Sequence, residues 1–373
     1  MLDFTSAHYL GTPAFVVPPG LALSTGRPAA LQEPGWHRHV AEMVARRQGL
    51  ETGLLAPSTL HLFWDVLALA PASAVVFVDE QMYPVGQWGA ARAALRGLPV
   101  VHFSADDLPG LRCLLHTYCP PGRLPWLLTD GWRLIAEAPA PLTHYLRLLR
   151  SYPRGMLLLD DTQAFGVLGR QPTPARPLGQ GGGGTLAYLG LNAPNILCVT
   201  SLAKGLGVPV ATLTGSRAWL ARFESSSATR VHTSPVSNWH AWAAGQALQH
   251  DASSSGAAAR RRLARRIREF RRALNGGGWQ VRGGWFPVQK LLLPTAPAAL
   301  GLHRHLARRG IRALLLADAQ RPAVPQLAFC LRADHSAVDV ARLTGALQAW
   351  DLASSTSNRR PRHEPDPEHA ACC

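Results

Sequence analysis

The chain has only two lysines against 36 arginines. One of them, Lys204, lies in the segment 201–207, which directly follows the apolar run 196–200. A lysine amine can act as a nucleophile once its pKa is lowered, whereas an arginine side chain keeps its proton in proteins. A second apolar run, 157–159, leads into Asp160 and Asp161. If both runs are strands of one sheet, an amine and a carboxylate meet at its edge, where they could perform covalent and proton-transfer chemistry.

The elements that would position these groups alternate along the middle of the chain. Short apolar runs alternate with segments of helical period, which is typical of βαβ units. We therefore expect an α/β fold with a mostly parallel central sheet and flanking helices. The predicted strands are 74–79, 98–103, 126–129, 156–160 and 196–200. Because functional groups in such sheets lie just beyond the carboxyl ends of the strands, Asp79, Asp160 and the turn 201–204 should share one edge.

An amine beside a strand-terminal carboxylate is the pair that a pyridoxal phosphate (PLP) enzyme needs. PLP withdraws electrons while its ring nitrogen stays protonated, and a neighbouring carboxylate holds the proton there. Successive strand residues point to opposite faces, so only one of Asp160 and Asp161 can do this, and we assign Asp160. Lys204 would bind the cofactor as a Schiff base and then move protons at the substrate α carbon.

The cofactor phosphate needs hydrogen-bond donors, which the start of a helix supplies. Pro57, Ser58 and Thr59 precede an apolar helical run, and Pro57 suits the first turn of a helix. Ser58 and Thr59 offer backbone amides and hydroxyls there. Ser201, just before Lys204, could add a further hydroxyl.

Composition and charge exclude several classes of protein. The net charge of +15 would suit an anionic partner, but neither a Cys/His finger spacing nor a basic motif interleaved with aromatic residues accompanies it. The basic stretch 260–272 predicts an amphipathic helix with a solvated cationic face, and binding of an acidic ligand or a nucleic acid is the alternative. The six cysteines lack metal or disulfide spacing. Without a signal peptide, and with the apolar window 62–78 interrupted, we expect a cytoplasmic protein with no membrane span.

Four units are predicted along the chain. These are an N-terminal arm (1–30), a large PLP-binding α/β domain (31–250), a small α+β domain (251–352) and a disordered tail (353–373). Within the large domain, Gly179–Gly184 predicts a flexible surface loop, with a lid over the site as the alternative. Ser336 and Asp339 are expected to cap the last helix.

Four segments, taken together and in order, resemble the motifs of the α-oxoamine synthases. They are 2–11, 160–169, 201–209 and 232–235, and the resemblance covers roughly residues 1 to 350. This family lies within the fold-type I PLP enzymes of the aminotransferase class I/II superfamily and includes 8-amino-7-oxononanoate synthase, 2-amino-3-ketobutyrate CoA ligase and serine palmitoyltransferase. The resemblance implies a homodimer whose active site lies between subunits. It also implies condensation of an amino acid or amine with an acyl thioester of coenzyme A or a carrier protein.

Residue by residue, the resemblance gives roles to individual positions. Asp160 matches the family's pyridinium aspartate and Lys204 its Schiff-base lysine. Ser201 and Thr233 match hydroxyl positions near the phosphate, with Thr233 reaching across the dimer. Catalytic work would thus fall to Lys204 and Asp160.

Two further cofactor-binding positions are altered. Tyr83 stands where the family has a histidine stacked on the pyridine ring, and an aromatic face can still stack there. Gln163 replaces the histidine that hydrogen-bonds the phenolic oxygen, and its amide N–H could still donate. Ala7 and Leu134 stand where the family has an asparagine and a serine that helps to hold the cofactor.

The substrate side departs further. Gln326 and Ala328 occupy the region where the family supplies the arginine that clamps the substrate carboxylate, and Arg332 is four residues away. A bidentate arginine is the strongest carboxylate anchor available. The amino substrate is therefore expected to be held differently.

Two alternatives remain open at this stage. One is another PLP reaction such as transamination, which needs the same Lys204 and Asp160 but no thioester site. The other is a non-catalytic relative that partners an active enzyme. The retained lysine argues against the second alternative, because a purely structural subunit needs no deprotonatable amine.

Overall fold

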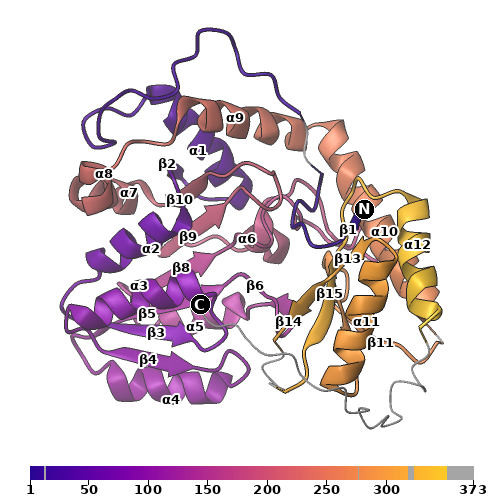
Figure 1. Ribbon diagram of the computed structural model, residues 1–373. Helices are drawn as coiled ribbons and strands as arrows, with labels where there is room; N and C mark the ends of the chain where they lie inside the picture. The colour runs from indigo at the N-terminus through magenta and orange to yellow at the C-terminus, as the bar shows by residue number, and fades with distance from the viewer. Residues whose placement is uncertain (12–13, 276, 318–322, 351–373) are drawn as a thin grey trace, which may run out of the picture.

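The computed structural model describes residues 1–11, 14–275, 277–317 and 323–350. A central sheet of seven strands fills one half of the molecule, and a smaller sheet with three helices forms the other half (Figure 1). In spatial order the strands of the large sheet are β2 (Thr52–Ala56), β10 (Ala211–Gly215), β9 (Ile196–Ser201), β8 (Met156–Asp160), β5 (Leu124–Asp130), β3 (Ala74–Asp79) and β4 (Val100–Phe103).

Five neighbouring strands of this sheet, from β9 to β4, run parallel, and β10 is antiparallel to both of its neighbours. Parallel strands must be covered on both faces. Val76 and Val78 of β3 therefore pack in one apolar cluster and Val75 and Phe77 in another, as the two-residue period of a strand requires. This confirms the predicted α/β class with a mostly parallel sheet.

Helices cover the two faces of the large sheet. The first cluster includes side chains of α2 (Thr59–Val66), the 3-10 turn η1 (Leu67–Leu69), α3 (Pro84–Leu95) and α7 (Arg217–Ser226). The opposite cluster includes α4 (Leu108–Tyr118), α5 (Leu142–Leu149) and α6 (Gly184–Leu189). Helices α1 (Gly35–Gln48) and α9 (Asn238–Ala252) pack together beside β2, and the short helix α8 (Ala228–His232) precedes α9.

The smaller sheet is antiparallel. Its order is β11 (Gln280–Arg282), β12 (Val288–Leu292), β15 (Gln326–Cys330) and β14 (Leu314–Leu316), and its core is closed by α10 (Ser254–Leu274), α11 (Ala296–Arg308) and α12 (Ala337–Gln348). A two-stranded ribbon joins β6 (Trp132–Arg133) to β7 (Ala138–Pro139). The N-terminal strand β1 (Leu2–Asp3) pairs with β13 (Ile311–Arg312), so the start of the chain lies against the C-terminal part (Figure 1).

Most of the predicted elements occur with small shifts at their ends. The strands 74–79 and 156–160 have the predicted bounds, and α1 ends at Gly49 in the left-handed conformation. The basic stretch 260–272 lies within α10, whose apolar face is buried, and Ser336 and Asp339 form a capping box on α12. No helix of the described residues is long and apolar enough to cross a membrane. The four cysteines of the described residues are free thiols.

The prediction of a flexible surface loop at Gly179–Gly184 is wrong for its second half. Gly182, Gly183 and Gly184 are buried, and Gly184 begins α6. Gly184 has a φ of +79°, and a Cβ atom there would lie 1.8 Å from Oδ2 of Asp161. This glycine therefore permits a close approach of two segments rather than flexibility. The domain boundaries stay predictions, and the predicted disordered tail lies outside the described residues.

Candidate active site

Lys204 lies in a tight turn that follows β9. The turn is fixed at its start, because the backbone N–H of Ser201 donates to Thr162 Oγ1 at 2.9 Å and that of Leu202 donates to the carbonyl of Val210 at 2.8 Å. The next residue, Gly205, lies so close to the preceding loop that a Cβ atom would be 2.3 Å from the carbonyl oxygen of Phe165. Only glycine permits this approach, so the sequence Lys204-Gly205 places the amine by close backbone packing.

Three carboxylates end three neighbouring strands at the same edge. Asp160 and Asp130 end β8 and β5 and are register partners across the two strands. Asp79 ends β3, and its Oδ2 accepts a hydrogen bond from Thr129 Oγ1 at 2.9 Å. Parallel strands that end together bring their last side chains into one place, which is where catalytic groups of α/β proteins lie.

Asp160 is buried on the lysine side of the sheet edge. Its Oδ1 accepts the backbone N–H of Thr162 at 2.9 Å. Burial raises the pKa of its carboxyl, and the hydrogen bonds from Thr162 and the charge of Lys204 act against that rise. Asp161 turns the other way and accepts the backbone N–H of Thr185 at the start of α6, where burial raises its pKa to about 7. The two residues thus diverge as the strand period predicts.

The amine of Lys204 is in an environment that favours its neutral form. Desolvation lowers the pKa of Lys204, while the charges of Asp160, Asp130 and Cys330 act in the opposite direction. Cys330 is the last residue of β15, so a group of the small sheet also acts on this amine. The Nζ atom also lies 5.4 Å from the ring centroid of Tyr83. The charges of Lys204 and Asp160 act on each other, so both groups lie at the same edge of the sheet, and the predicted pairing stays a prediction.

Asp130 is a site residue that the sequence reading missed. Its Oδ2 accepts the backbone N–H of Tyr83 at 3.2 Å, and its Oδ1 is buried without a hydrogen-bond partner among the described residues. Burial and then the neighbouring Asp160 charge raise the pKa of Asp130 well above its usual range. The signal that could have found it is its position, since it ends a buried strand as Asp160 and Asp79 do.

The N-terminal arm reaches the edge of the site through Tyr9. The hydroxyl of Tyr9 donates to Gln163 Oε1 at 2.8 Å. The two N–H groups of the Gln163 amide make no hydrogen bond within the described chain, so the expected donor at this position is available. Burial raises the pKa of Tyr9 well above its usual range, which keeps the phenol neutral and a donor.

The residues expected near the phosphate lie at starts and ends of elements. Ser58 caps the start of α2, with its Oγ 2.8 Å from His61 Nδ1, and Thr59 is the first residue of that helix. Ser201 ends β9, and its Oγ accepts the backbone N–H of Ala203 at 3.3 Å. Thr233 follows the last residue of α8, and its Oγ1 donates to the carbonyl of Thr229 at 2.7 Å. Within the described chain, Thr233 makes no hydrogen bond to Lys204.

The substrate-side departures lie on the small sheet. Gln326 and Ala328 belong to β15, and Ala328 is the register partner of Lys290 on β12. The amine of Lys290 donates to the carbonyl of Leu134 and lies 3.6 Å from Glu137. The cation on this part of the sheet is therefore already paired within the protein.

This arrangement fits PLP. The cofactor needs an amine of lowered pKa for its aldehyde, an acid for its ring nitrogen and polar partners at its edge. Lys204 and Asp160 provide the first two. The unpartnered Oδ1 of Asp130 and the free amide N–H groups of Gln163 are buried or half-buried polar groups that a bound polar molecule would satisfy.

Comparison with known proteins also points to a PLP-dependent enzyme. Residues 139–311 match the family Aminotransferase class I and II. The chain is 28% identical over 321 residues to a putative 8-amino-7-oxononanoate synthase of Thermosynechococcus vestitus, covering 84% of this chain and 76% of that protein. It is 30% identical over 286 residues to the 8-amino-7-oxononanoate synthase of Burkholderia thailandensis, covering 75% and 67%.

Among solved structures, the fold matches a variant of serine palmitoyltransferase from S. paucimobilis that contains PLP and myriocin. The TM-score is 0.77 at 15% identity, with 93% of this chain and 86% of that chain covered. This likeness confirms the fold-type I architecture. With the lysine, the strand-terminal aspartate and the ordered motifs in place, the chain belongs to the α-oxoamine synthase family of PLP-dependent transferases.

Proposed function

We propose that this protein condenses an amino acid or amine with an acyl thioester, as a biosynthetic PLP-dependent acyltransferase. The observation that carries this proposal is the meeting of Lys204 and Asp160 at one buried edge of the sheet, in a chain of the α-oxoamine synthase family. A carbon–carbon bond would form between the amino-bearing carbon and the thioester carbonyl carbon. The carbon–sulfur bond would break, and the free thiol would leave.

Lys204 and Asp160 would do the central work. Lys204 would attach the cofactor, because desolvation favours the neutral amine. The neutral Nζ can also take a proton from the reacting carbon of the substrate and return one later. Asp160 would hold a proton on the ring nitrogen. When bound, PLP supplies the electron sink that stabilises negative charge on that carbon.

The neighbouring residues would orient the cofactor. Tyr83 would offer an aromatic face, held in place by the hydrogen bond from its N–H to Asp130. Gln163 would donate an amide N–H to the phenolic oxygen, with its carbonyl oxygen fixed by Tyr9. Ser58, Thr59 and Ser201 would bind the phosphate, and Thr233 would do so from the partner subunit.

The amino substrate would lack the usual arginine clamp. Gln326 and Ala328 provide no cation, and Lys290 is paired with Glu137. We therefore propose a substrate whose recognition does not depend on a bidentate guanidinium–carboxylate pair.

The assembly and the setting are part of the same proposal. A homodimer is what the family resemblance implies, and the cysteines without disulfide spacing predict a cytoplasmic setting. Thr233 needs a second subunit to reach a phosphate near Lys204. The predicted arm, large domain and small domain would then meet at the site, since Tyr9, Lys204 and Cys330 come from these three parts. Light scattering on the purified chain gives the assembly state, and a monomer would contradict the role of Thr233.

A spectrum and a thiol assay test the reaction. The purified protein with PLP should have a visible absorbance band that Lys204→Ala removes. Supplying acyl-CoA with a panel of amino acids should then release free thiol in a manner dependent on both substrates. Release of a keto acid without any thiol would indicate transamination instead. A wild-type protein that binds no PLP would contradict both reactions.

A further inference from the structure

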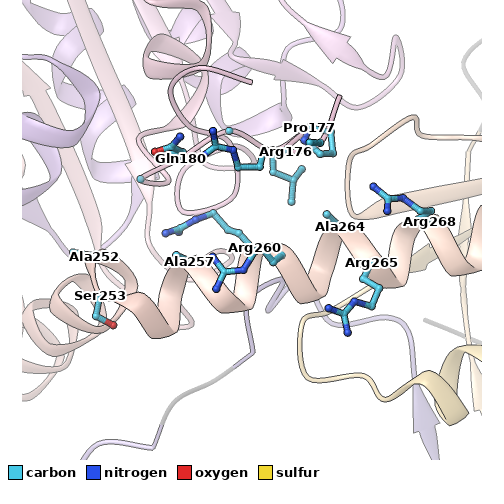
Figure 2. Close-up of a pocket in the computed structure, with 15 residues that line it drawn as sticks. Arg176, Pro177, Gln180, Ala252, Ser253, Ala257, Arg260, Ala264, Arg265 and Arg268 are labelled. Atoms are coloured by element: carbon cyan, nitrogen blue, oxygen red, sulfur yellow. The ribbon is translucent and has the colours of Figure 1, made fainter. Parts of the chain in front are cut away.

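A pocket of about 460 Å³ lies between α10 and the loop 175–181, away from the lysine site. Figure 2 shows Arg260 reaching from α10 toward the loop that carries Arg176 and Gln180, with Arg268 farther along the same helix. The volume of this pocket is in the range of small-molecule sites, which is about 300–1,000 Å³. Neither Lys204 nor any of the three strand-terminal aspartates lines it.

The walls of this pocket carry positive charge alone. Five arginines line it and no acidic residue does: Arg176, Arg260, Arg261, Arg265 and Arg268. Only Arg260 has a carboxylate partner, Asp251, which also pairs with Arg47. Within the described chain, no carboxylate lies within 4 Å of the other four guanidinium groups.

The arrangement on α10 costs stability, which points to a ligand. Arg261, Arg265 and Arg268 are spaced four and three residues apart, so they share one helix face. Like charges four residues apart on a helix destabilise it. The acid in this part of the helix, Glu269, pairs with Arg266 and not with this row. An anion in the pocket would relieve the repulsion.

The floor of the pocket is connected to the catalytic turn. Arg260 donates to the carbonyl of Gly166 at 3.0 Å. Gly166 in turn packs against Gly205, such that a Cβ atom at Gly166 would lie 3.4 Å from the Cα atom of Gly205. A ligand that contacts Arg260 would therefore be connected through Gly166 to Gly205, the residue next to Lys204.

We propose that this pocket binds a small ligand with two or more phosphate groups. Guanidinium groups bind phosphate oxygens in bidentate pairs, and four such groups without acidic partners match a diphosphate better than a single carboxylate. Such phosphates occur in coenzyme A and in free nucleotides. The assignment does not depend on the chemistry of Lys204, so it can hold even if the proposed function fails.

Calorimetric titration of the full-length protein tests the site. The probes are pyrophosphate, adenosine 3′,5′-bisphosphate, coenzyme A and ATP, each at low and at high salt. For pyrophosphate, adenosine 3′,5′-bisphosphate and ATP we expect one site per chain. For every probe we expect weaker binding at high salt, because opposite charges are screened. Preference for coenzyme A and the bisphosphate would identify a thioester carrier, whereas preference for ATP and pyrophosphate would identify a nucleotide.

Two variants locate the binding. Arg176→Gln with Arg261→Gln removes one exposed charge from each wall and should weaken binding at least tenfold. The matched control, Arg272→Gln with Arg308→Gln, removes two exposed helical arginines outside the pocket and should leave the affinity within twofold. Ala264→Glu keeps a good helix former but adds a carboxylate to the wall, so it should abolish binding.

Three results would overturn the proposal. The first is that none of the probes shows saturable binding. The second is that the pocket variant and the control variant lose affinity equally. The third is that the protein binds an acidic carrier protein but none of the small phosphates. Circular dichroism and thermal melting of each variant separate loss of the site from loss of the fold.

Discussion

The two lysines of the chain are in opposite surroundings. Lys290, on β12 of the small sheet, is buried, lies 3.6 Å from Glu137 and donates to the carbonyl of Leu134. Lys204, in the turn after β9, has no carboxylate within 4 Å in the described chain, and desolvation lowers its pKa. The amine of Lys290 is therefore held in an ion pair, whereas desolvation of Lys204 favours the reactive neutral amine. The surroundings, and not the residue type, decide which lysine can do covalent chemistry.

Position in the sheet explains this difference. Lys290 projects from the middle of an antiparallel strand, where cross-strand neighbours and the loop 134–137 surround it. Lys204 follows the end of a parallel strand, at the edge where three strand-terminal acids converge and where Asp160 and Asp130 act on the amine by charge alone, with no ion pair within 4 Å in the described chain. Substitution of each lysine therefore tests whether its surroundings decide its role.

The largest effect should come from Lys204→Ala. Loss of the amine removes both the attachment of the cofactor and the proton transfer at the substrate carbon. We expect the visible band to disappear and the rate of thiol release to fall by roughly 10⁴-fold or more, the upper end for loss of a general base. The same measurements on Lys290→Met should keep the band. A Lys204→Ala protein that retains the band would show that Lys204 is not the residue that attaches the cofactor.

Asp160→Asn should have the next largest effect. The amide cannot hold a proton on the ring nitrogen, while it keeps the size of the side chain and an oxygen for the N–H of Thr162. We expect cofactor binding to persist and the turnover to fall by roughly 10²–10³-fold, as for loss of one preorganised electrostatic contact. Asp161→Asn serves as the control, because that side chain faces Thr185, and an equal loss in both variants would refute the choice of Asp160.

Lys290→Met should affect stability instead of chemistry. It leaves Glu137 as a mostly buried carboxylate without its partner, and breaking one side of a buried pair costs roughly 3–5 kcal/mol. Urea unfolding should show this loss, and adding Glu137→Gln should recover most of it. If the visible band were lost while stability was unchanged, Lys290 and not Lys204 would be the chemical lysine.

The sequence predicts the parts of this site that follow from local patterns. The apolar runs before Asp160 and Lys204 are strands because they are buried on both faces, and parallel strands that end together bring their last residues to one edge. Asp130 was missed because the predicted strand ended at Thr129, one residue before the acid. The pairing of Leu2 with Ile311 has no local signal, since it depends on how two distant segments meet in the finished fold. The burial of Gly184 likewise depends on the approach of Asp161, which the glycine run alone does not indicate.

The smallest effect is a shift in the pH dependence of cofactor capture. Because the pKa of Lys204 is lowered, the rate at which the apoprotein captures PLP should rise with pH and level off below the range of an ordinary lysine. The charge of Asp130 acts against this lowering, so Asp130→Asn should move the midpoint to still lower pH while keeping an acceptor for the N–H of Tyr83. Stopped-flow absorbance measures the profile, with Glu42→Gln as a control that removes a remote acid. A shift to higher pH would contradict the electrostatic role of Asp130, and no shift would mean that its carboxyl is already neutral in the free protein.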